Sequence, residues 1–326
     1  MPSDSDLIVD RRQMRRKLTF WRVAAILTAI VAIVAVGLFA TPMGRRALGG
    51  GDAIARVTIE GLIRSDNDRV AALERLGRSS AKAVIVHINS PGGTTAGSEQ
   101  LFDALTRLKA KKPMVVVVEG LAASGGYIAA LASDQIIAHQ TSLVGSIGVL
   151  FQIPNVSDLL KTVGVKVEEV KSSPLKAAPN GYEPTSPEAR AALDSLVKDS
   201  YAWFRGLVKD RRGMDDATLQ TVADGRVFTG RQAVGLKLID QLGDEKTAVA
   251  WLVAQKKVGA DTPVRDFKLT PRFGDMTFLR ATASVALDAI GLGGLARQVE
   301  QSGVAQAVDR LGLDGMLALW HPSPAN

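Results

Sequence analysis

AVIVHINSPGG (residues 83–93) and MVVVVEGLAASGGY (residues 114–127) share one layout, in which an apolar run leads into a glycine-rich stretch. Continuous runs of Val and Ile are typical of strands that are covered on both faces, as in a parallel sheet. Residues 95–109, between the two stretches, have apolar side chains at helical spacing. This alternation predicts an α/β fold with right-handed β-α-β connections over a parallel sheet.

The same alternation continues on both sides of this centre. Residues 187–212 have apolar side chains at helical spacing opposite charged ones, which predicts a helix that packs against the core or another subunit. Beyond residue 258 the pattern loosens, and the Ala-, Gly- and Leu-rich residues 279–319 are expected to form packing helices, with a dimerising or membrane-surface tail as the alternative. The other expected elements are strands at 55–61 and 136–138, helices at 67–78, 124–133 and 245–256, and a turn, short helix and strand over 225–240.

The composition excludes several classes of protein. The chain has 326 residues, of which 46% are hydrophobic and 22% charged, so it can bury a large core. It has no cysteine, which excludes thiol catalysis, disulfides and thiolate metal sites. Its three histidines are scattered and aromatic residues make up only 5%, so neither a zinc site nor a base-stacking surface is expected. We therefore expect no metal, no cofactor and no nucleic-acid partner.

The amino-terminal residues predict a membrane anchor. Residues 23–41 form an uncharged apolar run, which as a helix would measure roughly 28 Å, close to the hydrocarbon thickness of a bilayer. Residues 1–22 carry six basic and three acidic residues, so the positive-inside rule places this tail in the cytoplasm and the rest of the chain outside. Glycine-rich residues 42–52 are expected to be a linker. A cleaved signal peptide and a buried soluble helix are the alternatives, and Arg45 and Arg46 weaken the charge asymmetry.

A first candidate for chemistry is NSPGG, residues 89–93, at the carboxyl end of a predicted buried strand. In open α/β sheets, sites form at that end of the strands. Pro91 is expected to fix a turn, and the following glycines let backbone N–H groups face an open space, where they could bind a developing oxyanion. A simple turn between strand and helix is the alternative.

A second candidate is Ser124, which follows a buried strand and opens a predicted helix among small residues. At a helix N-terminus the dipole stabilises negative charge, and small neighbours let a substrate backbone approach. The alternative is that Ser124 is only the N-cap of the helix, a role that serine favours.

A third candidate is Lys176, which lies among small and apolar residues, with no acid between Glu169 and Glu183. A lysine that loses its water has a lowered pKa and can serve as a base near neutral pH. Most lysines are solvated surface groups, so Lys176 is a candidate base only in combination with the other two segments.

Together these segments resemble the S49 serine peptidase family, in particular its short, single-domain signal peptide peptidase A form. The resemblance covers roughly residues 53–256 and the anchor. Ser124 and Lys176 are 52 residues apart, which fits the family. Each motif alone is weak, but four motifs in the family's order make a strong case. The motifs are NSPGG at 89–93, AASGGY at 122–127, SSPLK at 172–176, and GRVFTGRQA at 225–233 followed by Gly235, Leu236 and Asp240.

The resemblance implies a serine endopeptidase with Ser124 as nucleophile and Lys176 as general base. The backbone N–H groups of Gly93 and Gly125 would form the oxyanion hole, and Ser146 is a candidate support for Lys176. The implied substrates are cleaved signal peptides and other apolar segments near the membrane.

The resemblance also implies an architecture and a location. The fold would be ClpP/crotonase-like, built from repeated β-β-α or β-α-β units, with an N-terminal transmembrane helix, a peptidase domain over 53–256 and a helical extension of open role over 257–326. Family members form ring-shaped homo-oligomers, so the dyad can be completed across a subunit boundary, and the helix at 187–212 is a candidate ring contact. The protein would be a single-pass protein of the bacterial inner membrane, with its catalytic domain on the extracytoplasmic side.

Other interpretations stay open at this point. A related S49 peptidase could cut membrane-associated proteins, a crotonase-fold enzyme could act on acyl-CoA without a serine nucleophile, and a non-catalytic scaffold could keep the fold. For a Ser-His-Asp triad, His139 is only 15 residues beyond Ser124 and is expected to be structural. His87 lies within a buried strand and could point to either face, and His321 carries no motif. Tyr127 is expected to pack in the core, and Ser90 to be a turn residue.

Overall fold

The structure, a computed structural model, describes residues 20–30, 33, 52–256, 258–269 and 316–319. Contacts divide the chain into two compact units, Met1–Asp52 and Ala53–Asn326. In the first unit the described residues are helical, and nowhere in the described ranges is a helix both long and apolar enough to cross a membrane. The predicted tail, anchor and linker (1–22, 23–41 and 42–52) lie largely outside the described residues.

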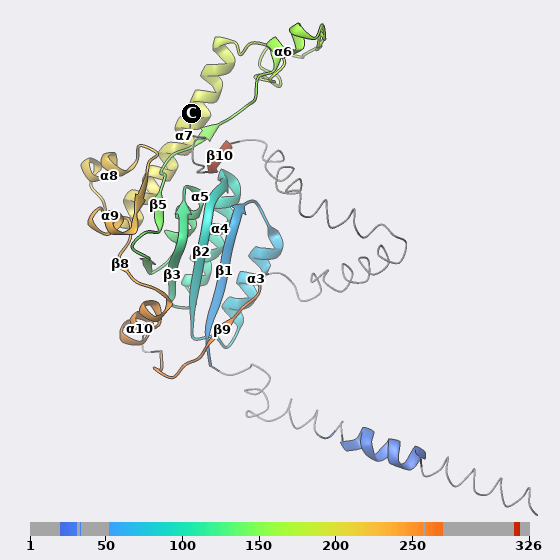
Figure 1. Cartoon of the computed structure of the whole chain (residues 1–326), viewed down its shortest axis with the longest axis vertical. Helices are drawn as coiled ribbons and strands as arrows, with labels where there is room; N and C mark the ends of the chain where they lie inside the picture. Colours follow the sequence, from blue (N-terminus) through green and yellow to red (C-terminus); the bar gives the residue numbers. More distant parts are fainter. Residues whose placement is uncertain (1–19, 31–32, 34–51, 257, 270–315, 320–326) are drawn as a thin grey trace, which may run out of the picture. The chain divides into compact units, whose positions relative to one another are not determined.

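The second unit is built on one mixed sheet, to which ten strands of the described chain belong (Figure 1). The strands are β1 (Ile54–Ile63), β2 (Ala83–Thr94), β3 (Met114–Ala123), β4 (Gln135–Ala138), β5 (Leu143–Gly145), β6 (Leu150–Phe151), β7 (Val227–Thr229), β8 (Gln241–Leu242), β9 (Val264–Asp266) and β10 (Met316–Leu319). The helices described in this unit are α3 (Asn67–Arg78), α4 (Thr95–Lys109), α5 (Gly125–Ala130), α6 (Ser157–Thr162), α7 (Pro187–Arg212), α8 (Asp216–Val222), α9 (Gly230–Gly235) and α10 (Glu245–Lys256).

The centre of the sheet is parallel, as predicted. Strand β2 pairs in parallel with β1 on one edge and with β3 on the other, and β3 continues to β4 and β5. Three pairings are antiparallel: β5 with β7, and β10 with both β2 and β6. The predicted α/β fold with a parallel centre is therefore confirmed, whereas the three antiparallel pairings were not predicted.

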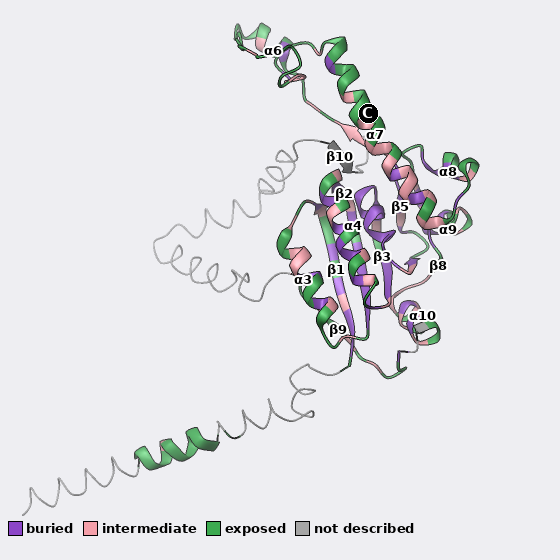
Figure 2. Ribbon diagram, turned by 180° about the vertical axis from the view of Figure 1, so that it is seen from behind, coloured by how far each residue is buried: buried purple, intermediate pink, exposed green. Residues whose placement is uncertain are grey.

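Both faces of the central strands are buried (Figure 2). Along β2, Val84 and Val86 belong to the main core, which includes side chains of α3, α4, α5 and α7. Ile85 points to the opposite face, where it packs with Ala248 and Leu252 of α10. This is the alternation that a pleated strand imposes, and it explains why the strand sequences are almost continuously apolar.

Four helices, α3, α4, α7 and α10, have the bounds that the sequence predicts, and capping residues mark the starts of the first three. Asp66 and Thr94 accept hydrogen bonds from the first turns of α3 and α4, and Ser186 does so for α7. Helix α7 begins with Pro187 and ends at Gly213, whose φ of 59° is left-handed. Proline at the start and glycine just past the end are the usual boundaries of a helix.

The glycine-rich stretches differ from the prediction. We expected β2 to end near residue 88 and β3 near 118, but β2 continues through NSPGG to Thr94 and β3 continues to Ala123. Pro91 therefore lies within an extended strand and not in a turn. The helix expected over 124–133 is the shorter α5, and within 225–240 the strand β7 precedes the helix α9.

The described part of residues 257–326 is also different from the helices that we expected. Strand β9 pairs with β1, and β10 pairs with β2 and β6. Residues 270–315 and 320–326 lie outside the described residues. Two segments of the expected helical extension are thus strands of the main sheet.

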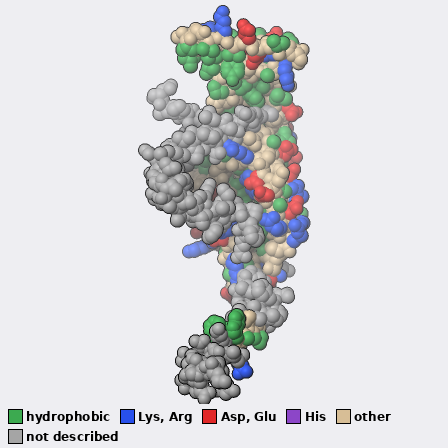
Figure 3. Space-filling model, turned by 90° about the vertical axis from the view of Figure 1, so that its right-hand side faces the viewer, with side chains coloured by type: hydrophobic (Ala, Val, Ile, Leu, Met, Phe, Trp, Pro, Cys, Tyr) green, Lys and Arg blue, Asp and Glu red, His purple; other side chains and the backbone are tan. Residues whose placement is uncertain are grey.

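Helix α7 has two different halves. Its carboxyl half buries Phe204 and Val208 in the main core, whereas Leu196 in its amino half is 52% exposed. The segment that leads into α7, with α6, projects beyond the sheet and carries further exposed apolar side chains, so hydrophobic atoms gather at that end of the molecule (Figures 1 and 3). These exposed side chains include Leu159, Val163, Val165, Val167, Val170 and Leu175.

Candidate active site

Ser124 occupies the sharp junction between β3 and α5. Its backbone has φ 52° and ψ −116°, a conformation that residues with a side chain rarely adopt and that costs about 1–3 kcal/mol. Three backbone hydrogen bonds hold it there, one of which the Ile128 N–H donates to the Ser124 carbonyl at 3.0 Å. The Ser124 N–H donates to the Gly145 carbonyl at 2.8 Å, and the Ser124 carbonyl accepts from the Tyr127 N–H at 2.9 Å. The strain is therefore stabilised by β5 on one side and by the first turn of α5 on the other.

The Ser124 hydroxyl is buried and has no hydrogen-bond partner among the described residues. The residue is 1% exposed, and its Oγ makes no capping bond to α5. A buried polar group without a partner costs about 1–3 kcal/mol, and such groups are few in folded proteins. The alternative that Ser124 serves as a side-chain N-cap is therefore wrong.

Only glycine fits beside Ser124 on α5. A Cβ on Gly126 would lie 2.7 Å from the Ser90 carbonyl oxygen, so the helix packs directly against the β2 backbone.

Helix α5 has only six residues, so its dipole is weaker than that of a long helix. The first N–H groups of α5, including that of Gly125, have no partner within the helix. These N–H groups are what the amino end of α5 offers to a negative charge.

Gly93 lies inside β2, not in an open turn. It stands opposite Ile63 of β1 and opposite Ala318 of β10. A Cβ at this position would lie 1.8 Å from the Ile63 carbonyl oxygen, so only glycine allows β1 to approach so closely. The open space that we expected around this glycine is absent, because strands occupy both of its edges.

Two serines hold the strands around this site. The Ser90 hydroxyl donates to the Gly61 carbonyl at 2.7 Å and accepts from the Gly92 N–H at 3.1 Å, which fixes the NSPGG part of β2. Ser90 is thus a support of a strand and not the turn residue that we expected. The Ser142 hydroxyl donates to the carbonyls of Val118 and Glu119 on β3.

Ser146 is distant from Ser124 in sequence but lies next to one of its backbone contacts. It follows Gly145, whose carbonyl accepts the Ser124 N–H, and it is buried with φ 51°. Its own N–H donates to the Arg226 carbonyl at 2.8 Å, in the GRVFTGRQA motif. The fold therefore brings Ser124, Ser146 and that motif together, although a contact between Ser146 and Lys176 stays a prediction.

Lys176 is exposed in the single chain. It lies in the segment between α6 and α7, and its N–H donates to the Ser173 carbonyl at 3.1 Å. The acids at either end of this segment pair with Lys171, at 2.7 Å for Glu169 and 2.6 Å for Glu183. Lys176 makes no ion pair among the described residues. The dry environment that a lysine base needs is thus absent within one chain, and its pairing with Ser124 stays a prediction.

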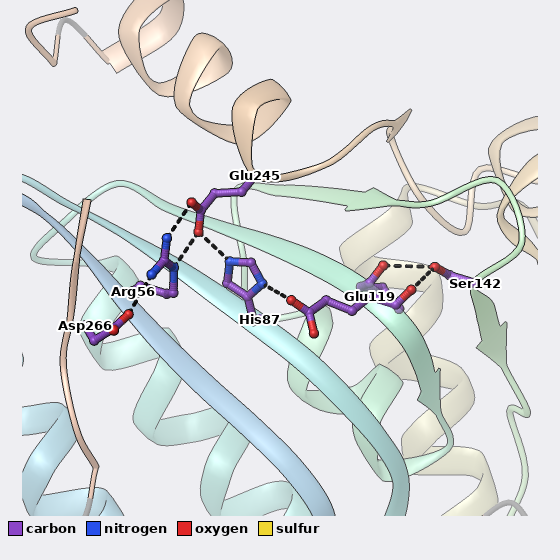
Figure 4. Close-up of polar contacts among 7 residues, drawn as sticks. Arg56, His87, Glu119, Ser142, Glu245 and Asp266 are labelled. Carbon is purple, nitrogen blue, oxygen red and sulfur yellow. Dashed lines mark hydrogen bonds and ion pairs between the residues drawn. The ribbon is translucent and has the colours of Figure 1, made fainter. Parts of the chain in front are cut away.

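The histidines of the described chain are not partners of Ser124. His139 is exposed and follows β4, and His321 lies outside the described residues. His87 is buried on the α10 face of β2, where both ring nitrogens contact carboxylates (Figure 4). A Ser-His-Asp triad is therefore not assembled around Ser124 in the described structure. Tyr127 packs in the core as expected, and its hydroxyl donates to the Leu238 carbonyl at 2.7 Å.

The His87 contacts belong to a polar network that the sequence did not reveal. Glu119 Oε1 is 2.7 Å from His87 Nδ1, and Glu245 Oε2 is 2.8 Å from Nε2 (Figure 4). Arg56 donates twice to Glu245, at 2.6 Å each, and once to Asp266 at 2.7 Å. The alternation along each strand could have placed Arg56, His87 and Glu119 on one face, but not the arrival of α10 above them. The described residues contain no cluster of acids and histidines suited to a metal ion.

A hollow of about 700 Å³ lies between the β6 region and the amino half of α7. Apolar side chains line much of it, including Phe151, Ile153, Leu193 and Val197. Arg190 and Asp194 also line the hollow. Such a hollow can receive an apolar side chain of a ligand.

Several known proteins are similar to this chain. A putative protease of Synechocystis is 35% identical over 200 residues, which cover 61% of this chain and 72% of that protein. A putative signal peptide peptidase SppA of Enterococcus faecium is 33% identical over 190 residues, covering 58% of this chain and 55% of that protein. A solved structure of a ClpP1 mutant from Listeria monocytogenes has a TM-score of 0.41 at 15% identity, covering 58% of this chain and 91% of that one.

Two family models match the chain over the region that holds the site. The model of peptidase family S49 matches residues 106–259, and the model of Clp protease matches residues 63–143. The S49 match includes Ser124, Ser146 and Lys176. Together with the Synechocystis relative, most of whose length this chain covers, these matches show that the chain belongs to peptidase family S49 and is a serine protease.

Proposed function

We propose that this serine protease is a membrane-anchored endopeptidase in which Ser124 is the nucleophile and Lys176, supplied by a neighbouring subunit, is the general base. The observation that carries the proposal is the Ser124 hydroxyl, which is buried, unpartnered and held on a strained backbone. Strain and unsatisfied polar groups persist where function needs them. A hydroxyl without a partner is free to take one from outside the chain.

The proposed chemistry needs two proton transfers by one amine. Lys176, as the neutral amine, removes the proton of Ser124 Oγ while Oγ bonds to the scissile carbonyl carbon. The N–H group of Gly125, at the start of α5, stabilises the oxyanion. The N–H group of Gly93, which the resemblance adds to the oxyanion hole, can join it only when a strand beside it is displaced, because β1 and β10 occupy both of its edges. The C–N bond then breaks as the Lys176 ammonium returns the proton to the leaving amine. Water hydrolyses the acyl-enzyme by the same route, and Ser124 is regenerated.

A neighbouring subunit is invoked because Lys176 is exposed in one chain. A lysine becomes a base at neutral pH when it is desolvated, and assembly can bury a side chain that a single chain leaves in water. Lys176 belongs to the projecting segment with exposed apolar side chains, which is suited to contact a second copy. We propose a ring-shaped homo-oligomer in which this segment reaches the next subunit.

The proposed substrates are apolar peptides, among them remnant signal peptides. The hollow between β6 and α7 is lined largely by apolar side chains, which suits such peptides. The printed name of the Enterococcus relative is that of a signal peptide peptidase. A bacterial inner-membrane location, with the catalytic domain outside, follows from the apolar run at 23–41 and the basic tail before it.

The test compares three single variants of the assembled protein: Ser124→Ala, Lys176→Ala and Lys166→Ala. Lys166 is a matched control, because it is another exposed lysine of the same projecting segment. We expect the first two changes to lower kcat for an apolar peptide by on the order of 10⁴-fold or more, and Lys166→Ala to leave it within about twofold. Cleavage that survives Ser124→Ala would refute the nucleophile, and cleavage that survives Lys176→Ala would refute the base.

A further inference from the structure

The carboxyl end of α7 meets the short helix that begins after Ser124. Helices α5 and α7 are in contact, and Phe204 and Val208 of α7 belong to the same core as the side chains of α5. Arg211 follows Phe204 and Val208 at helical intervals of four and three residues, so it lies on the same face of α7. The periodicity of α7 therefore places one guanidinium beside α5, about a turn beyond the core.

The Arg211 guanidinium closes the carboxyl end of α5. Its Nε donates to the Leu131 carbonyl at 2.7 Å, and its Nη2 donates to the Ser133 carbonyl at 2.9 Å. The last carbonyls of a helix have no partner within it, and a basic side chain can supply both the hydrogen bonds and a favourable charge. Leu131 is buried, so its carbonyl depends on such a partner. Arg211 thus fastens the exit of α5 to α7.

The opposite end of α5 begins at Ser124. The helix has six residues, so it spans roughly 9 Å, and all six are buried. Its contact with β2 is tight, since a Cβ on Gly126 would lie 2.7 Å from the Ser90 carbonyl oxygen. Close-packed elements transmit displacements, so a shift at one end of this helix reaches the other. The strained backbone of Ser124 persists only under restraint from its surroundings, and Arg211 supplies part of that restraint.

We propose that Arg211 is a positioning residue of this protease, which holds Ser124 Oγ in its attacking position through α5. The proposal rests on the proposed function, because it takes Ser124 as the nucleophile. Arg211 acts from the far end of the helix, where both of its hydrogen bonds lie. A reacting atom misplaced by about 1 Å can lose on the order of 10²-fold in rate. Loss of Arg211 therefore slows the attack of Ser124 Oγ and leaves the binding of substrate unchanged.

The test compares Arg211→Gln and Arg211→Lys with Arg56→Gln in the assembled protein. Arg56 is the matched control, because it is a partly exposed arginine that donates to Glu245 and Asp266 on the α10 face of the sheet, whereas α5 belongs to the core on the other face. Thermal unfolding of the three variants records how much stability each one loses. A purely structural role for Arg211 predicts equal activity losses at equal stability.

The first readout is the rate of acylation by an apolar peptide p-nitrophenyl ester. Ser124 Oγ bonds to the acyl carbon, its proton passes to the base, and nitrophenolate leaves, so the burst of nitrophenolate measures the attack itself. We expect Arg211→Gln to slow acylation about tenfold or more. Arg211→Lys should slow it less, by about threefold, because an ammonium can keep one of the two carbonyls. Arg56→Gln should leave the rate within about twofold.

The second readout is the division between kcat and KM for an apolar peptide. Arg211→Gln is expected to lower kcat about tenfold or more and to leave KM within about twofold, because it removes positioning and not binding. An unchanged acylation rate, or a loss of activity no greater than that of Arg56→Gln at equal stability, would overturn the proposal. If Arg211→Gln does not fold, the same comparison is decided by Arg211→Lys.

Mass spectrometry of the acylated unmodified protein keeps the two proposals apart. An acyl group on Ser124, formed at the same rate in Arg211→Gln, would overturn the role of Arg211 and leave the nucleophile standing. An acyl group on another residue would refute Ser124 as the nucleophile, and with it the positioning by Arg211.

Discussion

Two buried serines of this protein have opposite hydrogen-bonding states. The Ser90 hydroxyl has two partners, the Gly61 carbonyl and the Gly92 N–H. The Ser124 hydroxyl has none among the described residues, although both serines are almost fully buried. The free energy of removing a hydroxyl depends on this difference, because an unpaired buried group is a cost that its removal relieves.

We therefore predict opposite effects of the same substitution at these positions. Ser90→Ala is expected to lower the free energy of unfolding by about 1–3 kcal/mol, because it leaves the Gly61 carbonyl and the Gly92 N–H unpaired. Ser124→Ala is expected to raise it by about 0.5–2 kcal/mol while abolishing cleavage, the usual exchange between stability and activity at a strained site. Urea denaturation of both variants checks the signs. Destabilisation by Ser124→Ala would show that its hydroxyl is satisfied in solution.

Gly126 sets the contact between α5 and β2. We predict that Gly126→Ala lowers stability by about 1–3 kcal/mol and lowers activity at least tenfold, because its Cβ would lie 2.7 Å from the Ser90 carbonyl oxygen and must displace α5. Gly206→Ala on α7 is the control, since a Cβ there meets nothing within 4 Å and alanine favours a helix. That change should raise stability by up to about 1 kcal/mol. Thermal unfolding and a peptide-cleavage assay distinguish the two.

At the scale of elements, the sequence predicts the helix bounds that depend on residues close by in the chain. The bounds of α3, α4 and α7 follow from capping residues such as Asp66, Thr94 and Ser186, all visible in the sequence. The continuation of β2 through Pro91 could not be predicted, because it depends on pairing with β1 and β10, which are distant in sequence. Strand β10 itself was expected to be helical for the same reason. Ser124 was identified as a candidate from its motif. Only the structure shows that its hydroxyl has no hydrogen-bond partner among the described residues.

The polar network on the α10 face gives a pH-dependent prediction. Arg56, and then His87, hold the pKa of Glu245 below its usual range, although burial opposes them. Because the folded-state pKa is depressed, the stability from this carboxylate is complete above its ordinary value near 4.5 and is lost as pH falls through the folded-state value. Glu245→Gln should cost about 1–3 kcal/mol at pH 7. It should also flatten the loss of stability below about pH 5. Unfolding curves between pH 7 and 3 that run parallel for the two proteins would contradict this role.

The two halves of α7 should respond differently to mutation. Phe204 is fully buried in the core, so Phe204→Ala is expected to cost about 3–5 kcal/mol of stability. Leu196 is 52% exposed, so Leu196→Asp should change the stability of the chain by less than about 0.5 kcal/mol and instead weaken assembly. Analytical ultracentrifugation of the two variants checks the second effect. An unchanged oligomer with Leu196→Asp would remove the amino half of α7 from the proposed ring contact.

At the scale of the whole molecule, the positions of Ser124 and Lys176 determine whether one chain or an assembly is needed for activity. One chain holds the buried, unpartnered hydroxyl of Ser124 in its core and the exposed Lys176 on a projecting segment. The motifs in the sequence identify both residues. They do not show whether the two side chains meet within one chain or between neighbouring chains. Desolvation of the lysine by a neighbouring copy would make activity depend on assembly, so the active fraction should rise with protein concentration.

Mixing two inactive variants tests this arrangement directly. If the dyad forms between subunits, co-assembly of Ser124→Ala with Lys176→Ala chains restores sites in which Ser124 comes from one chain and Lys176 from its neighbour. With random mixing at equal amounts, one site in four should regain the native pair, so we expect about a quarter of the unmodified activity. If both residues come from the same chain, no mixture restores a site and activity stays at the level of the single variants. Mixtures prepared without subunit exchange supply the control, and their activity should remain at the background of the separate variants.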